Sequence, residues 1–228
     1  MLEPVSPLAV QRGLSLIELM VGLAIGLFIV SVAITLLSSH LHEQRALMLD
    51  SRLVQDLRAT ADLIARDLRR AGYWGDAAAG VWRSGASGVA ANPYAAIAPS
   101  AAASDAVSFR FSRDSNENQL VDLNEQFGFR LRKGVIEMLI GGGWQAVTDS
   151  TTLVVSEFTV EPVVQETLLQ RLCLTPCPLA SGSCPPKQQV RSLALTVSGH
   201  PANDPSVVRS VRAAVRLRND AVIGACAA

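Results

Sequence analysis

The feature that most constrains this chain is a long apolar run near its start, with a single carboxylate at its head. Residues 19–37 include no Asp, Glu, Lys or Arg, and Glu18 stands directly before them. At about 1.5 Å of rise per residue, a helix of this length can cross a bilayer core of roughly 30 Å. A carboxylate at the edge of such a run is costly without a partner. The run therefore predicts a membrane helix, and Glu18 requires a group that neutralises it.

A secretory signal that is removed completely is the weaker interpretation of this run. The apolar part of such a signal spans about 7–15 residues, and no A-x-A-like cleavage site follows here. The positive flank is also weak, because Glu3 offsets Arg12 in the preceding segment. The sequence favours a helix that stays in the membrane.

The helix is expected to continue past the membrane as an amphipathic segment. Neither Pro nor Gly occurs between Gly26 and Gly72, and Gly72 suits a helix C-terminus after Arg69 and Arg70. The pattern predicts one helix of about 55 residues. Its apolar stripe outside the membrane consists of Leu49, Leu53, Leu57, Ala61, Ile64 and Leu68.

Alternating apolar and polar residues predict a sheet after the helix. A loop rich in Ala, Gly and Ser is expected over residues 75–104, with Trp82 and Tyr94 as its anchors. Strands are expected near residues 107–111, 127–131, 135–140, 152–160, 190–198 and 207–217, with turns at Lys133-Gly134 and at 141–143. The predicted fold class is α+β, a long N-terminal helix packed on an antiparallel β-sheet head.

The four cysteines lie in the last quarter of the chain and suggest disulfides. They are Cys173, Cys177, Cys184 and Cys226. An even count fits an oxidising compartment, and three pairings are possible. Zinc is the rival interpretation, but a C-x3-C pair with a third Cys and no nearby His is a poor ligand set.

One internal segment has the spacing of a twelve-residue calcium loop. Its oxygen ligands would be the side chains of Asp114, Asn116, Asn118, Asp122 and Glu125 and the backbone carbonyl of Leu120. Gln119 replaces the usual glycine, and strands flank the segment. The alternative is a hairpin loop in which the same residues bond their own backbone.

The sequence offers no catalytic constellation and a balanced charge, so an enzyme is not expected. Twenty basic residues match twenty acidic ones, which gives no bulk field for nucleic acid. Arg212, Arg216 and Arg218 would share a face with Arg130 or Arg132 if their strands pair, and Arg209 is close by. The sequence favours a solvated strand face for these arginines, and a DNA-contacting stripe is the alternative.

The residues around Glu18 resemble a known processing site. The segment Gly13-Leu14-Ser15-Leu16-Ile17-Glu18-Leu19-Met20 is similar to that of type IV prepilins and type II secretion pseudopilins. The resemblance implies that a prepilin peptidase cleaves between Gly13 and Leu14 and methylates Leu14. It also implies that Glu18 pairs with the N-terminal ammonium of a neighbouring subunit. The usual first residue is Phe, whereas Leu14 stands here.

Shorter blocks resemble PilW-type minor pilins, with J-type minor pseudopilins of type II secretion as the alternative. They lie at residues 66–75, 127–131, 142–144 together with 148–149, and 215–220. The resemblance implies a leader at 1–13, a membrane and filament-core helix at 14–39, an amphipathic helix at 40–72 and a periplasmic head at 73–228. It also implies a single-pass inner-membrane protein that later joins the pilus tip and supports motility, adhesion or DNA uptake. The implied partners are other minor pilins, the major pilin and the inner-membrane assembly platform. No cofactor is required, although calcium is possible.

Overall fold

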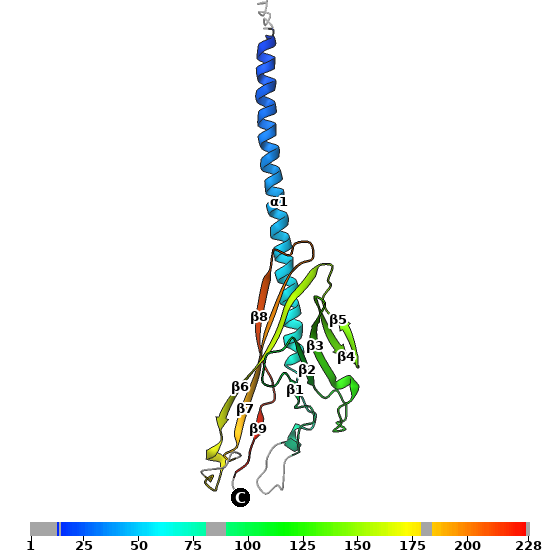
Figure 1. The fold of residues 1–228 in the computed structure, drawn as a ribbon, viewed down its shortest axis with the longest axis vertical. Coiled ribbons are helices and arrows are strands. Elements are labelled where there is room, and N and C mark those ends of the chain that lie inside the picture. Colours follow the sequence, from blue (N-terminus) through cyan, green and yellow to red (C-terminus); the bar gives the residue numbers. More distant parts are fainter. Residues whose placement is uncertain (1–12, 14, 81–89, 179–183, 227–228) are drawn as a thin grey trace, which may run out of the picture. The chain divides into compact units, whose positions relative to one another are not determined.

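The computed structural model describes residues 13, 15–80, 90–178 and 184–226 (Figure 1). The chain divides into two compact units, residues 1–49 and 50–228. Within the described residues the elements are α1 (Leu16–Leu68), β1 (Ile97–Ala98), β2 (Ala106–Arg110), β3 (Gln126–Arg132), β4 (Val135–Ile140), β5 (Gly143–Ala146), β6 (Leu153–Leu168), β7 (Lys187–Pro201), β8 (Arg209–Arg216) and β9 (Ala221–Ile223). Short 3-10 turns lie at Ala77–Gly80, Leu123–Glu125 and Gln170–Leu172. This is the α+β architecture that the sequence predicts.

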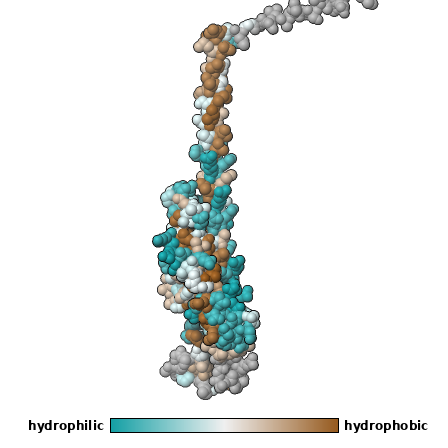
Figure 2. All heavy atoms as spheres, turned by 90° about the vertical axis from the view of Figure 1, so that its right-hand side faces the viewer, coloured by the Kyte–Doolittle hydropathy of each residue, from teal (hydrophilic) through white to brown (hydrophobic). Residues whose placement is uncertain are grey.

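The first unit contains the apolar half of α1. By length and composition, the helix is long and apolar enough to cross a membrane. Its side chains are exposed, and Figure 2 shows the hydrophobic ones gathered along this segment. An exposed apolar surface of this extent needs lipid or protein around it.

The second half of α1 belongs to the head and buries the predicted stripe. Leu53, Leu57, Ala61, Ile64 and Leu68 are each at most 3% exposed. Leu49, which lies in the first unit, is the exception at 39%. α1 ends at Leu68, four residues earlier than predicted, and the chain turns until Gly72, whose φ of +75° is the left-handed conformation that glycine favours.

The head contains two antiparallel sheets rather than one. The first has the strand order β1-β2-β3-β4-β5, and the second has β6-β7-β8, with β9 also paired to β7. The predicted turn at Lys133-Gly134 is confirmed, with φ values of 51° and 77° that suit a tight hairpin. The alternation of apolar and polar residues located most of the strands, but it did not show which strands belong to which sheet.

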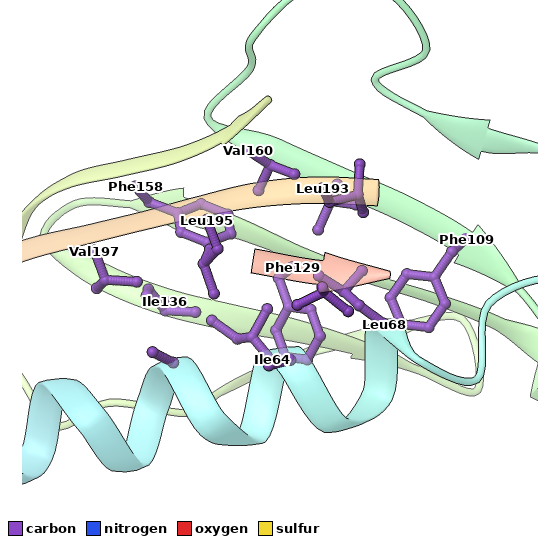
Figure 3. Close-up of a cluster of buried hydrophobic side chains, with 14 of the residues drawn as sticks. Ile64, Leu68, Phe109, Phe129, Ile136, Phe158, Val160, Leu193, Leu195 and Val197 are labelled. Atoms are coloured by element: carbon purple, nitrogen blue, oxygen red, sulfur yellow. The ribbon is translucent and has the colours of Figure 1, made fainter. Parts of the chain in front are cut away.

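The core lies where α1 meets both sheets. Figure 3 shows Ile64 and Leu68 of α1 facing Phe129 of β3, with side chains of the second sheet, such as Leu195, closing the same cluster. Phe111 and Phe127 stack with their ring centroids 4.1 Å apart. The head is therefore organised around the amphipathic half of the helix.

Strands β6 and β7 are longer than predicted. They pair from Leu153↔Pro201 to Leu168↔Lys187, with a bulge between Val155 and Glu157. β6 therefore continues past Val160, through Pro162, into a segment whose side chains are mostly exposed. A proline is tolerated there because β6 is an edge strand of its sheet and needs no amide donor on the open side.

Candidate functional site

The start of α1 contains the predicted processing residues. Gly13 is exposed, has no regular structure, and has open space where a Cβ would lie. Leu14 and residues 1–12, the predicted cleavage partner and most of the predicted leader, lie outside the described residues. The exposed backbone at Gly13 is accessible to an enzyme.

Ser15 caps the helix by bonding to Glu18. The backbone N–H of Glu18 donates to Ser15 Oγ over 3.3 Å and to the Ser15 carbonyl over 3.1 Å. A Ser three residues before a Glu is the sequence pattern of a capping box, so this role could have been recognised from the sequence. The carboxylate of Glu18 also lies in the first turn, where the helix dipole favours negative charge. Glu18 thus has a local stabilising role beside its predicted intermolecular one.

In the head, the carboxylate of Glu117 accepts several hydrogen bonds, and the sequence analysis did not identify this residue. Glu117 Oε2 accepts the backbone N–H of Gly75 at 3.0 Å, and Oε1 accepts the Tyr94 hydroxyl at 2.9 Å. The N–H of Gln119 also donates to Oε1, at 3.0 Å. Burial raises the pKa of Glu117, but the hydrogen bonds from Ser112, Gln119, Tyr94 and Gly75 outweigh burial and hold it below its ordinary value. Burial and the Glu117 partner raise the pKa of Tyr94, so the phenol stays protonated.

The predicted calcium-loop residues form an internally bonded loop. Asn118 links two of them, because its N–H donates to Asp114 Oδ2 at 3.3 Å and its Nδ2 donates to Asp122 Oδ2 at 3.2 Å. Leu120 N–H donates to Asn118 Oδ1 over 2.7 Å, an Asx-type contact, and the Leu120 carbonyl accepts the Tyr94 hydroxyl. Gln119 adopts a φ of 64°, the conformation that the usual glycine would supply.

Glu125, the predicted bidentate ligand, is fully buried and bonded to the backbone. Its Oε1 accepts the N–H of Arg113 over 2.8 Å, and its Oε2 accepts the N–H of Asp122 over 3.0 Å. Asn116 is exposed. Calcium binding stays a prediction, and it would have to compete with these donors for the Glu125 oxygens.

The cysteines form two disulfides, and the structure selects one of the three pairings. Cys173 bonds Cys226, and Cys177 bonds Cys184, with sulfur–sulfur distances of 2.09 and 2.00 Å. The sulfurs of Cys173, Cys177 and Cys184 all lie within 4.8 Å of one another. The two bonds therefore fasten the chain after β6 to the segment before β7 and to the C-terminal end.

Arg209, Arg212 and Arg216 lie in β8, but β8 does not pair with β3, as the DNA alternative required. β8 pairs with β7, whereas β3, which carries Arg130 and Arg132, pairs with β2 and β4 in the other sheet. The condition that these strands pair is therefore wrong. Arg209 contacts Asp50 at 2.8 Å and Arg216 contacts Asp220 at 3.1 Å, so two of the cations already face carboxylates.

The apolar N-terminal helix and the two-sheet antiparallel head define a pilin-like protein. The family model described as prepilin peptidase-dependent protein B matches residues 46–217, about three quarters of the chain. The chain belongs to this family. No curated protein and no solved structure matches it. The matched range begins after the apolar run, so Gly13 and Glu18 are observations independent of the family match.

Proposed function

We propose that the protein is a minor pilin, of the PilW type, that takes part in priming type IV pilus assembly. The observation that carries this proposal is the position of Glu18, in the first turn of an exposed apolar helix and close behind Gly13. A simple anchor has no need for a carboxylate there. The family name supports a dependence on prepilin peptidase, which would cleave between Gly13 and Leu14 and methylate Leu14.

The apolar half of α1 would be surrounded first by lipid and later by helices of other subunits. While the subunit waits in the inner membrane, lipid covers the apolar side chains, and the head faces the periplasm, where the disulfides can form. During assembly, the same side chains would pack against helices of other minor pilins and of the major pilin. The assembly platform would move the subunit from one environment to the other, into a complex at the fibre tip.

Glu18 would set the register of this packing. In a water-poor bundle, the N-terminal ammonium of a neighbouring Leu14 would neutralise the Glu18 carboxylate. This ammonium would pair with Glu18 more readily than with any other residue of the bundle. Subunits displaced along the bundle would leave Glu18 unpaired, which is strongly unfavourable. Fibre growth would thereby select one axial position for each new subunit.

Processing can be tested by replacing Gly13 with Ala and following the size of the protein in membranes. The expected result is a heavier band, because the leader stays attached. Gly22→Ala is a matched control, since Gly22 also has open space at its Cβ position but lies inside α1. Normal processing of Gly13→Ala would contradict the cleavage assignment.

The cellular role can be tested in a strain that lacks this gene. The proposal expects few or no surface pili, with secreted enzymes unaffected and piliation restored by the wild-type gene. Loss of secretion with normal pili would instead assign the protein to a type II secretion system as a minor pseudopilin. Normal pili and normal secretion would overturn both assignments.

A further inference from the structure

A cavity in the head has a lining that combines apolar side chains with a cation. Its volume is about 340 Å³, and it lies between the segment that carries β1 and the outer part of the β6–β7 ladder. Its lining includes Ile97, Pro99, Pro162, Val164, Arg191 and Leu193. A volume of this order is at the lower end of the range that small organic ligands occupy.

Arg191 is the cation of this cavity, and its guanidinium is held by carbonyl groups. Its Nη1 donates to the Ala95 carbonyl over 3.1 Å, and its Nη2 donates to the Asn219 carbonyl over 3.2 Å. Its Nε is buried and has no hydrogen-bond acceptor in the part of the chain that the structure describes. The guanidinium is thus fixed in position, and the donor capacity left over for a ligand is the second N–H of Nη1 and of Nη2.

The charge of Arg191 is incompletely balanced. Desolvation lowers the pKa of this arginine, and only the field of Asp220 acts in the opposite direction. Asp220 is already engaged, because its Oδ2 accepts from Gln188 Nε2 at 2.8 Å and from Arg216 Nη2 at 3.1 Å. A partly buried cation that faces carbonyl oxygens rather than a carboxylate of its own favours an external anion.

We propose that this cavity binds a carboxylate carried on a short apolar body. A planar carboxylate matches the fork of a guanidinium and supplies the single negative charge that one arginine balances. Phosphate would bring a second charge, and the described residues of the lining include no second cation to balance it. Val164, Pro162, Ile97 and Leu193 would cover the apolar body of the ligand.

The β6–β7 register provides a blocking variant and a matched control. Val164 lies directly across from Arg191, whereas the next residue, Val163, lies across from Ser192 on the opposite face of the sheet. The two valines are similarly accessible, at 44% and 41% exposed. In Val164→Glu, a tethered carboxylate would occupy the place of the ligand beside Arg191. In Val163→Glu, the same charge would lie outside the cavity.

The test uses the full chain in detergent with labelled arginine, and follows the Nε–H signal of Arg191 by NMR during titration with hexanoate. The expected result is a saturable shift in the wild type and in Val163→Glu, and binding weaker by about tenfold in Val164→Glu. Hexanamide, which has the same size and no charge, should leave the signal unmoved. No shift with hexanoate, an equal shift with hexanamide, or equal loss of binding in both valine variants would overturn the proposal.

A second arm identifies the source of the carboxylate. A capped tripeptide with a central glutamate replaces hexanoate in the same titration. Tighter binding of the peptide supports an acidic side chain of a neighbouring polypeptide, and tighter binding of hexanoate supports a free organic acid. An outcome that overturns the cavity proposal does not bear on the minor-pilin assignment, which rests on α1.

Discussion

Tyr94 donates its hydroxyl hydrogen to Glu117 Oε1 over 2.9 Å, and so connects the segment after α1 to the loop before β3. The same carboxylate accepts the N–H of Gly75, which lies just past the end of the helix. The ionised side chain of Glu117 therefore connects three segments that are distant in the sequence. None of them forms a helix or strand at the residue that makes the contact. The stability of this end of the head should depend on the charge of Glu117.

We expect the head to lose stability in acid in part through Glu117. Because the folded structure lowers the pKa of this carboxyl, the stabilisation is complete above the unfolded value near 4.3. It is lost as the pH falls through the lower pKa of the folded state, when the proton binds. In Glu117→Gln the unfolding temperature should be lower at neutral pH and should fall less on acidification. Thermal unfolding of the full chain in detergent between pH 7 and pH 3 measures this change.

Glu161→Gln is the control for this experiment. Glu161 is an exposed residue of β6, so removing its charge should leave the pH profile as it is in the wild type. A Glu117→Gln profile parallel to that of the wild type would show that other carboxylates account for the acid sensitivity.

Truncation of the helix stripe should destabilise the head strongly. Ile64 is fully buried between α1 and the sheets, so Ile64→Ala removes packing that the rigid strands cannot restore. The expected loss is about 2–5 kcal/mol of unfolding free energy. Arg58→Ala, on the exposed side of the same helix, should change it by less than about 0.5 kcal/mol. Denaturant unfolding measures both, and equal effects would contradict the assigned core.

The two disulfides should contribute unequally. Cys173–Cys226 closes a sequence separation of 53 residues and Cys177–Cys184 one of 7, so the first restricts the unfolded chain more. Loop-closure entropy gives about 4 kcal/mol for the long loop and about 2 kcal/mol for the short one. Replacing each pair by serines and comparing denaturant unfolding measures the difference. A larger loss from the Cys177/Cys184 pair would show that local packing, rather than loop length, decides their contributions.

The sequence predicted the elements that depend on local pattern, and it missed what depends on distant contacts. The periodicity of Leu53, Ile64 and Leu68 identified the buried face of the helix, and Lys133-Gly134 identified a turn because glycine permits positive φ there. The division into two sheets was not visible, because alternation reports which side of a strand is buried but not which strand lies beside it. For the same reason the sequence did not show that β3, which carries Arg130, and β8 lie in different sheets.

The candidate site shows the same limit. Ser15 and Glu18 are close in sequence, so their capping contact follows from spacing. Glu117 meets Gly75 and Tyr94 across long stretches of chain, and no motif marks it. Trp82, the other predicted anchor of the loop before β1, lies outside the described residues, whereas Tyr94 is buried as predicted.

Calcium binding by the loop can be tested without disturbing Glu125. Asp114 is a predicted ligand at the loop surface, and Asn at this position keeps an acceptor for the Asn118 N–H while removing charge. We expect calorimetric titration of the full chain with calcium to give a saturable heat that Asp114→Asn reduces and that magnesium does not reproduce. The absence of heat in the wild type would show that the loop is held by its internal hydrogen bonds alone.

The two roles of Glu18 can be separated by comparing Glu18→Gln with Ser15→Ala. Glutamine preserves side-chain length and can still cap the helix, but it cannot neutralise an ammonium on a neighbouring subunit. Ser15→Ala removes the Oγ that accepts the Glu18 N–H, a loss of about 1 kcal/mol at the helix start, and leaves the carboxylate in place. If charge pairing sets the register, Glu18→Gln should insert into membranes normally and reduce incorporation into sheared pili, whereas Ser15→Ala should retain most of it. The measurement is the ratio of the amount of the protein in the pilus fraction to the amount in the membrane fraction. Equal defects in the two variants would assign the requirement to capping of α1 rather than to contact between subunits.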